Sequence, residues 1–248
     1  MKLTINTSFQ ENASSPYLLI LVDSEQLQKA ATSYEINNLS ALVEAAQFKA
    51  SLTESLPLIG KVEVCSNTVL IGIDKAADLQ ANKLAKIAQS IIKTSQKKFK
   101  QISIDISALA VEQHYLFALA LTQAAYAFDE YKSKKNEFVL ETIHLVAQHS
   151  QLNDAQLNLI HAVQAGQNYA RDLGNRPPNI CFPEYLAEQA IALAAQYPEL
   201  LKVTILDEQQ IADLGMYAFL AVSKGSERAG RIICLEYHAS VEQAPVVL

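Results

Sequence analysis

Histidines are candidate functional residues, because imidazole binds metals and exchanges protons near neutral pH. The chain has five histidines, and none of them belongs to an HExxH motif or pairs with a cysteine at the spacing of zinc ligands. They are His114, His144, His149, His161 and His238. We interpret them as surface or core histidines and not as a metal site.

Motifs for nucleophilic catalysis and for phosphate binding are also missing from the sequence. It has no GxSxG and no GxGxxG, and Gly60-Lys61 lacks the glycine loop that precedes the lysine of a P-loop. Glycine is scarce, at 7 of 248 residues. Since glycine-rich loops usually cradle phosphates, this scarcity indicates a scaffold more than a chemical centre.

Charged residues offer two weaker candidates for chemistry. Asp74 and Asp78 flank a predicted strand end and helix start, where a carboxylate pair could bind a metal; we interpret them instead as a solvated turn and a helix cap. The lysine clusters at 97–100 and 132–135 could bind phosphate. We interpret them as solvated helix ends and loops, because the formal net charge is -6.

Composition indicates a globular protein. Hydrophobic residues are 50% and charged residues 19%, and the pI near 5.4 disfavours a general nucleic-acid binder. The N-terminus lacks a signal-peptide pattern and no apolar run is long enough to span a membrane, so we expect a cytoplasmic protein. The cysteines, Cys65, Cys181 and Cys234, are far apart and odd in number, which is typical of reduced core thiols.

Hydrophobic periodicity predicts alternating strands and helices in the first 150 residues. The strands are expected at 17–22, 62–65, 69–73, 102–106 and 138–146, with a turn at 66–67 joining the second to the third. The helices are expected at 35–48, 78–94 and 111–126, with Asp78 as the N-cap of the second. This order predicts an α/β domain whose central sheet is covered on both faces.

A long helix is expected at 153–173, followed by the best domain boundary in the chain. Gly174 stands where a helix C′ glycine belongs, and Pro177 follows as a stop. We therefore predict an N-terminal domain at 1–150, a linker helix at 151–174 and the start of a second domain at 175–248. The predicted structural junction comprises Gly174, Asn175, Pro177, Pro178 and Asn179. Proline and asparagine set geometry here, since they are poor acids, bases and nucleophiles.

The second domain is expected to continue the α/β pattern. Pro183 can occupy the first turn of a helix that runs to about Gln196, and Asp207 can cap a short helix that ends near Gly215. Strands are expected at 202–206 and 231–237, and another begins at Pro245. Because the chain stops inside that apolar strand, we expect an incomplete domain with a sheet edge that lacks its neighbour.

Three stretches resemble the leucyl (cytosol) aminopeptidase family. They are Ala127-Phe-Asp-Glu-Tyr-Lys-Ser-Lys-Lys135, the junction from Asn168 to Glu188 with its Asn-Arg-Pro-Pro-Asn core, and Leu214 to Ser226 followed by Arg231 to Tyr237. With the order of elements, the resemblance covers the whole chain. It is specific from about Phe128 onward and weak before it.

The resemblance implies a macro-like α/β N-terminal domain and the truncated start of an α/β/α zinc-exopeptidase-like catalytic domain. It implies an enzyme that removes N-terminal residues, often leucine, from peptides and assembles as a hexamer. Two divalent ions, zinc or manganese, would polarise the scissile carbonyl and activate water.

The sequence departs from the family where chemistry is concerned. The motifs Gly-Lys-Gly…Asp-x-Gly-Gly and Asn-Thr-Asp-Ala-Glu-Gly-Arg, which supply the family's metal ligands and catalytic residues, do not occur here. We therefore assign no catalytic or metal-binding residue, expect the two-metal centre beyond residue 248, and expect this chain alone to be inactive.

A second hypothesis belongs to a different class. The chain could be a non-catalytic assembly or binding module, with the N-terminal domain binding a nucleotide or the lysine clusters binding DNA. The lack of a glycine-rich phosphate loop counts against the nucleotide.

Overall fold

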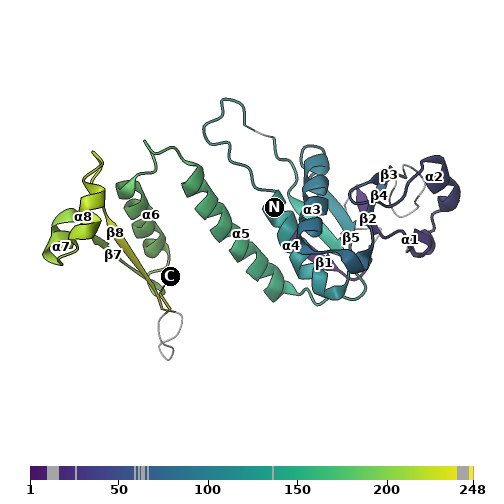
Figure 1. The fold of residues 1–248 in the computed structure, drawn as a ribbon. Coiled ribbons are helices and arrows are strands. Elements are labelled where there is room, and N and C mark those ends of the chain that lie inside the picture. Colours follow the sequence, from purple (N-terminus) through teal and green to yellow (C-terminus); the bar gives the residue numbers. More distant parts are fainter. Residues whose placement is uncertain are drawn as a thin grey trace. The chain divides into compact units, whose positions relative to one another are not determined.

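The computed structural model describes residues 1–9, 17–25, 27–58, 60, 62, 65, 67–135, 137–238 and 246–247. These residues fall into two compact units, Met1–Tyr169 and Ala170–Leu248, whose elements are labelled in Figure 1. Each unit is described by itself.

The first unit is built on a six-stranded sheet. The strand order is β1-β6-β5-β2-β4-β3, and all neighbours run parallel except β3, which pairs antiparallel with β4. The strands are β1 (Lys2–Asn6), β2 (Leu18–Val22), β3 (Ser55–Pro57), β4 (Thr68–Gly72), β5 (Gln101–Asp105) and β6 (Thr142–Val146). Parallel strands need crossover connections, which the intervening helices provide.

One face of this sheet packs on two long helices and the start of a third. Alternate strand residues such as Leu19, Leu21 and Ile104 share a core with Phe117 of α4 and Ile160 of α5. The three helices are α3 (Ala81–Ser95), α4 (Val111–Ala124) and α5 (Asp154–Asn175). Because the side chains of a strand alternate between faces, the intervening residues of β2 point the other way.

The opposite face is covered over β2 and β4. Leu18, Ile20 and Leu70 pack there against Leu39 and Phe48. This layer includes two short helices, α1 (Leu27–Ser33) and α2 (Leu39–Ala45). The predicted α/β architecture with a sheet covered on both faces is therefore confirmed.

The second unit contains a helix, a two-stranded sheet and two short helices. The elements are α6 (Pro183–Gln196), β7 (Leu201–Leu206), α7 (Glu208–Asp213), α8 (Tyr217–Ser223) and β8 (Ile232–Tyr237), with β7 and β8 antiparallel. Pro183 begins α6, and the Asp207 side chain accepts a hydrogen bond from the Gln210 N–H at 2.9 Å. Both predicted helix starts are confirmed.

The prediction that Gly174 ends the long helix is wrong. Helix α5 continues through Gly174 to Asn175, and the Arg176 N–H still donates to the Asp172 carbonyl at 3.1 Å. The backbone there is not left-handed, unlike that of Gly215, which has a φ of 75° after α7. Gly215 therefore ends α7 in a left-handed conformation, whereas Gly174 does not end α5.

This difference gives a test by substitution. Gly174→Ala should raise the free energy of unfolding by up to about 1 kcal/mol, because alanine is the better helix former and an added Cβ at Gly174 meets no atom within 4 Å. Gly215→Ala should lower it by about 1–2 kcal/mol, because a left-handed alanine is strained. Urea denaturation of both variants measures the two effects. If Gly174→Ala were instead less stable than the natural chain, Gly174 would end α5 as the sequence predicted.

Other local predictions need correction. Asp78 lies in a short 3-10 helix (η1, Ala76–Asp78) and α3 begins after Gln80, so Asp78 is not its N-cap. The helix expected at 35–48 is only α2, because Glu35, Asn38 and Gln47 all have left-handed backbones.

The predicted pairing of a strand at 62–65 with a strand at 69–73 is also wrong for the residues of 62–65 that the structure describes. Val62 and Cys65 lie outside regular structure, and β4 pairs instead with β3, which the sequence did not predict. The strand expected at 138–146 begins only at Thr142. Of the strand expected from Pro245, only Val246 and Val247 lie among the described residues, and they are not in a strand.

Candidate functional site

A pocket of about 410 Å³ lies where β2, β5 and β6 end. Its walls come from these strand ends, from the segment that follows β1, and from α1 and the start of α4. After β2 the chain continues to β3 and β4 on one side of it, whereas the connection after β4 returns to β5 on the other side. This reversal of strand order is the place where open α/β sheets bind ligands, outside the carboxyl ends of the strands.

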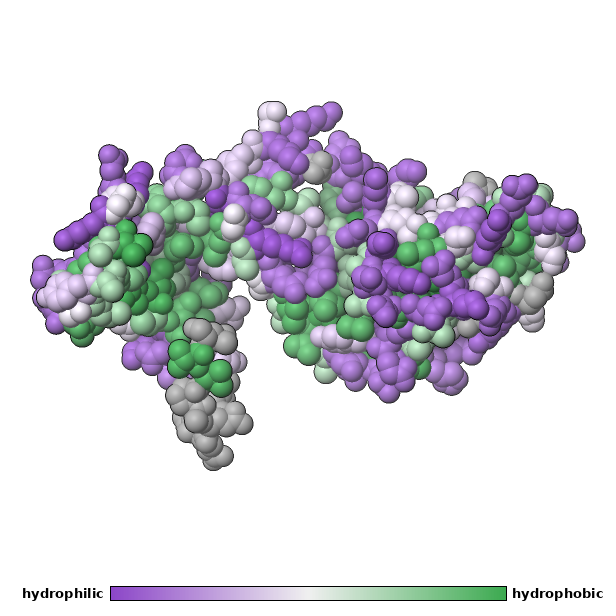
Figure 2. All heavy atoms as spheres, in the orientation of Figure 1, coloured by the Kyte–Doolittle hydropathy of each residue, from purple (hydrophilic) through white to green (hydrophobic). Residues whose placement is uncertain are grey.

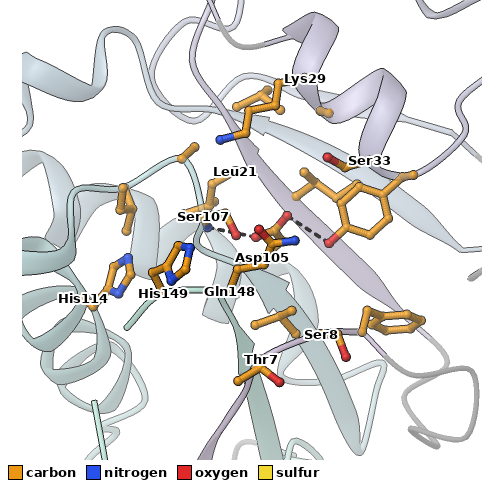
Figure 3. A pocket seen from close by; sticks show the side chains of 18 of the residues that line it. Thr7, Ser8, Leu21, Lys29, Ser33, Asp105, Ser107, His114, Gln148 and His149 are labelled. Carbon is orange, nitrogen blue, oxygen red and sulfur yellow. Dashed lines mark hydrogen bonds between the residues drawn. The ribbon is translucent and has the colours of Figure 1, made fainter. Parts of the chain in front are cut away.

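A fixed carboxylate lies in this pocket. Asp105, the last residue of β5, is 9% exposed, and its two oxygens accept hydrogen bonds from the Tyr34 hydroxyl at 2.9 Å and the Ser107 N–H at 2.8 Å (Figure 3). Burial and the Asp105 charge raise the pKa of Tyr34, so its phenol stays protonated and keeps donating. Asp105 is thus held in one orientation by groups from the turn after α1 and from its own loop.

A buried histidine also lines the pocket. His114 on α4 is 1% exposed, and its Nδ1 lies 3.0 Å from the Ser150 hydroxyl. Its Nε2 is buried without a hydrogen-bond partner among the described residues. Burial lowers the pKa of His114, although the carbonyls of Ile106 and Leu109 act in the opposite direction. The ring is therefore neutral at pH 7.

The lowered pKa of His114 predicts a loss of stability in mild acid. The unfolded chain takes up a proton at the usual histidine pKa of 6.5, whereas the folded chain does so only at lower pH. The stabilisation is thus complete above pH 6.5 and falls as the pH drops below it. Urea midpoints at pH 7.5 and 5.5 should differ less in His114→Gln than in the natural chain.

Lys29, Gln148 and His149 are further polar groups of the pocket. Figure 3 shows the Lys29 ammonium reaching in from α1, and His149 and Gln148 entering from the segment after β6. No sequence motif marks this pocket. Its residues come from five separate segments, and only the predicted strand ends indicate that some of them lie close together.

The groups considered from the sequence do not form a metal centre in the described part of the chain. No cluster of three or more His, Cys, Asp or Glu residues occurs there that could hold a metal ion. Asp74 instead accepts a hydrogen bond from the Leu52 N–H at 2.8 Å and lies 3.5 Å from the Lys83 ammonium. The two metal ions implied by the resemblance therefore have no fitting site among these residues.

The three cysteines are all free, but only one matches the expected core thiol. Cys65 is buried, Cys181 is intermediate and Cys234 is exposed.

The predicted junction forms a turn between α5 and α6. The N–H groups of Ile180 and Cys181 both donate to the Pro177 carbonyl at 2.9 Å. Phe182 precedes α6 without a side-chain cap, and the Arg228 guanidinium lies 4.4 Å from the centre of its ring. Arg231 binds Glu184 at 2.6 Å in the first turn of α6. The role of Gly174 to Asn179 as a rigid junction stays a prediction.

Apolar side chains remain exposed in the second unit. Among the residues of its helices and strands and the turns beside them, Val222, Tyr217, Tyr237 and Leu214 are exposed by 63% to 82%. Figure 2 shows hydrophobic surface over the unit that carries α6 to α8. In the described residues, no helix combines the length and hydrophobicity needed to cross a membrane.

Comparison with known families decides the relationship. The model of the cytosol aminopeptidase family N-terminal domain matches residues 18–135, and that of the family's catalytic domain matches residues 168–248. The chain belongs to the cytosol aminopeptidase family. The resemblance inferred from the sequence is therefore confirmed.

Individual relatives agree with this assignment. A probable cytosol aminopeptidase of Acinetobacter baumannii (strain ATCC 17978) is 65% identical over 100% of this chain and 52% of the relative. One of Acinetobacter baylyi is 60% identical over the same shares, and one of Pseudomonas syringae pv. tomato is 32% identical over 96% of this chain and 51% of the relative. The chain thus spans about half the length of the curated relatives it matches.

A solved structure shares the fold. A mutant of tomato leucine aminopeptidase matches with a TM-score of 0.76 and 19% identity, over 95% of this chain and 50% of that one. At this identity the likeness establishes the fold alone.

Proposed function

We propose that this chain is the N-terminal part of a metal-dependent aminopeptidase that removes N-terminal residues, preferentially leucine, from peptides. One observation carries the proposal. The family's N-terminal and catalytic domains match in order along the chain, and relatives at 60% and 65% identity bear the name probable cytosol aminopeptidase. Cytoplasmic location and peptide substrates follow from the same match.

The catalytic centre is proposed to lie beyond residue 248. The described residues contain no metal-binding cluster, and the family's two ligand motifs are absent from the sequence. We propose two divalent ions, manganese or zinc, for the full-length protein and none for this chain. A hexameric assembly and a macro-like role of the first unit belong to the same proposal.

The proposal predicts a sharp difference in activity. The purified 248-residue chain should not hydrolyse leucine p-nitroanilide with added manganese, because it lacks metal ligands. The native protein isolated from its source cells should hydrolyse the substrate, lose activity with a chelator and regain it with manganese or zinc. Metal-dependent turnover by the chain alone would refute the proposed position of the centre. Failure of the native protein to cleave any N-terminal residue would refute the activity.

A non-catalytic binding role is the second candidate, and the pocket of the first unit favours it. The DNA form of this hypothesis rests only on the exposed lysines of 97–100 and 132–135. Binding of duplex DNA that weakens steeply between two salt concentrations would support it.

A further inference from the structure

The Asp105 carboxylate is the first reason to expect a ligand in the pocket. It is nearly buried, and no described lysine, arginine or histidine forms an ion pair with it. Each oxygen accepts one hydrogen bond from the protein, and a carboxylate oxygen can accept two. A buried charge without a cationic partner is costly, so a ligand that donates hydroxyl or amine hydrogens would satisfy it.

A second group of features favours a negative charge elsewhere in the same ligand. Lys29 places its ammonium at the pocket (Figure 3). Leu109 and Val111 bring the start of α4 to the pocket wall, and this helix of 14 residues has no acidic or hydroxyl cap at Ala110. A helix start carries partial positive charge and attracts anions. His114 lines the pocket too, and its buried Nε2, which has no hydrogen-bond partner among the described residues, is an independent polar atom of the same region.

The walls between these polar groups are apolar. Ile20, Val22 and Val146 come from the strand ends, and Phe9 and Tyr34 add aromatic rings. A volume of about 410 Å³ falls in the range of small-molecule sites and is too large for a single small ion. The pocket therefore suits a molecule with a flat or apolar body, hydroxyl or amine donors and an anionic group.

We propose that this pocket binds a nucleoside phosphate. Its sugar hydroxyls or base amine would donate to Asp105, and its phosphate would lie toward Lys29 and the start of α4. The site belongs to the N-terminal unit, so the inference does not depend on the proposed aminopeptidase activity. It assigns to this unit a ligand that differs from the peptide substrate.

The test measures binding of AMP to the 248-residue chain and to the native protein by isothermal titration calorimetry. Adenosine, inorganic phosphate and leucine serve as separate probes. AMP should bind saturably to both proteins. Adenosine or phosphate alone should bind at least tenfold more weakly, because adenosine lacks the phosphate and inorganic phosphate lacks the nucleoside. Leucine should not compete.

Substitutions of pocket residues test whether AMP binds in this pocket. Asp105→Asn should weaken AMP binding at least tenfold, and Lys29→Ala should weaken it severalfold and reduce its dependence on salt. Lys86→Ala, which removes an exposed lysine of α3 away from the pocket, is the matched control and should bind like the natural chain. Circular dichroism checks that each variant is folded. Because Lys29 is exposed, its variant remains informative even if Asp105→Asn unfolds.

Several results would overturn the proposal. These are no saturable binding of AMP, binding of phosphate or leucine as tight as that of AMP, or equal effects of Lys29→Ala and Lys86→Ala. Peptidase activity of the native protein is measured separately, so loss of either proposal leaves the other standing.

Discussion

Gly72→Ala should destabilise the first unit by about 2–3 kcal/mol, the upper part of the range for overpacking. Gly72 ends β4, and a Cβ placed there would overlap the Ser51 carbonyl oxygen and the Ala50 carbonyl carbon. These are backbone atoms and cannot rotate away. The segment is held in place, since the Gly72 N–H donates to Glu54 at 2.8 Å and the Thr53 N–H donates to Gly72 at 2.9 Å.

Gly166→Ala is the control for this experiment. Gly166 is exposed within α5, and an added Cβ meets no atom within 4 Å. Alanine there should stabilise the helix by about 0.5–1 kcal/mol. Urea denaturation followed by circular dichroism compares the two variants. Equal stability of Gly72→Ala and the natural chain would show that the segment at 50–54 does not pack on β4 as described.

Phe117→Ala should cost still more, about 3–5 kcal/mol, because it deletes a buried aromatic ring and leaves a cavity. Phe117 is 0% exposed and packs in the core between α3, α4 and the sheet. Such a loss is a large fraction of the stability of a domain, so we expect part of the purified variant to be unfolded.

The neighbouring residue supplies the matched control. Leu116 is 44% exposed on the same helix, and Leu116→Ala should change the unfolding free energy by less than about 1 kcal/mol. A thermal melt of both variants distinguishes them. If Leu116→Ala cost as much as Phe117→Ala, the buried face of α4 would be assigned wrongly.

The elements that the sequence predicted well have strong local signals. Leu18 to Val22 form a continuous apolar strand, and α6 and α7 begin at the predicted Pro183 and Asp207. Each of these signals depends on residues close together in the chain. At the start of α7, the Asp207 side chain also satisfies the Gln210 N–H, a backbone group that would otherwise lack a partner.

The errors arise where tertiary contacts decide. Nothing in the short sequence Ser55–Pro57 distinguishes β3 from a loop, and its strand character comes from pairing with β4. Gly174 predicts a helix end because glycine is common at that position, yet α5 continues through it.

The pocket could be predicted only in part. Parallel strands bring their carboxyl ends to one edge, so the position of Asp105 after a strand was a usable signal. The hydrogen bond from Tyr34 was not, since 71 residues separate the two in sequence. Metal ligands could not be placed at all, because the family motifs that supply them are absent from this sequence.

The central claim is that this chain is part of a larger metal-dependent aminopeptidase. The most direct measurement is the intact mass of the native protein, captured from its source cells with an antibody against this stretch. We predict a mass well above 27.2 kDa, because the chain spans only 52% of its relatives at 65% identity. A native mass of 27.2 kDa would contradict the claim, since the described part of such a chain holds no metal-binding cluster.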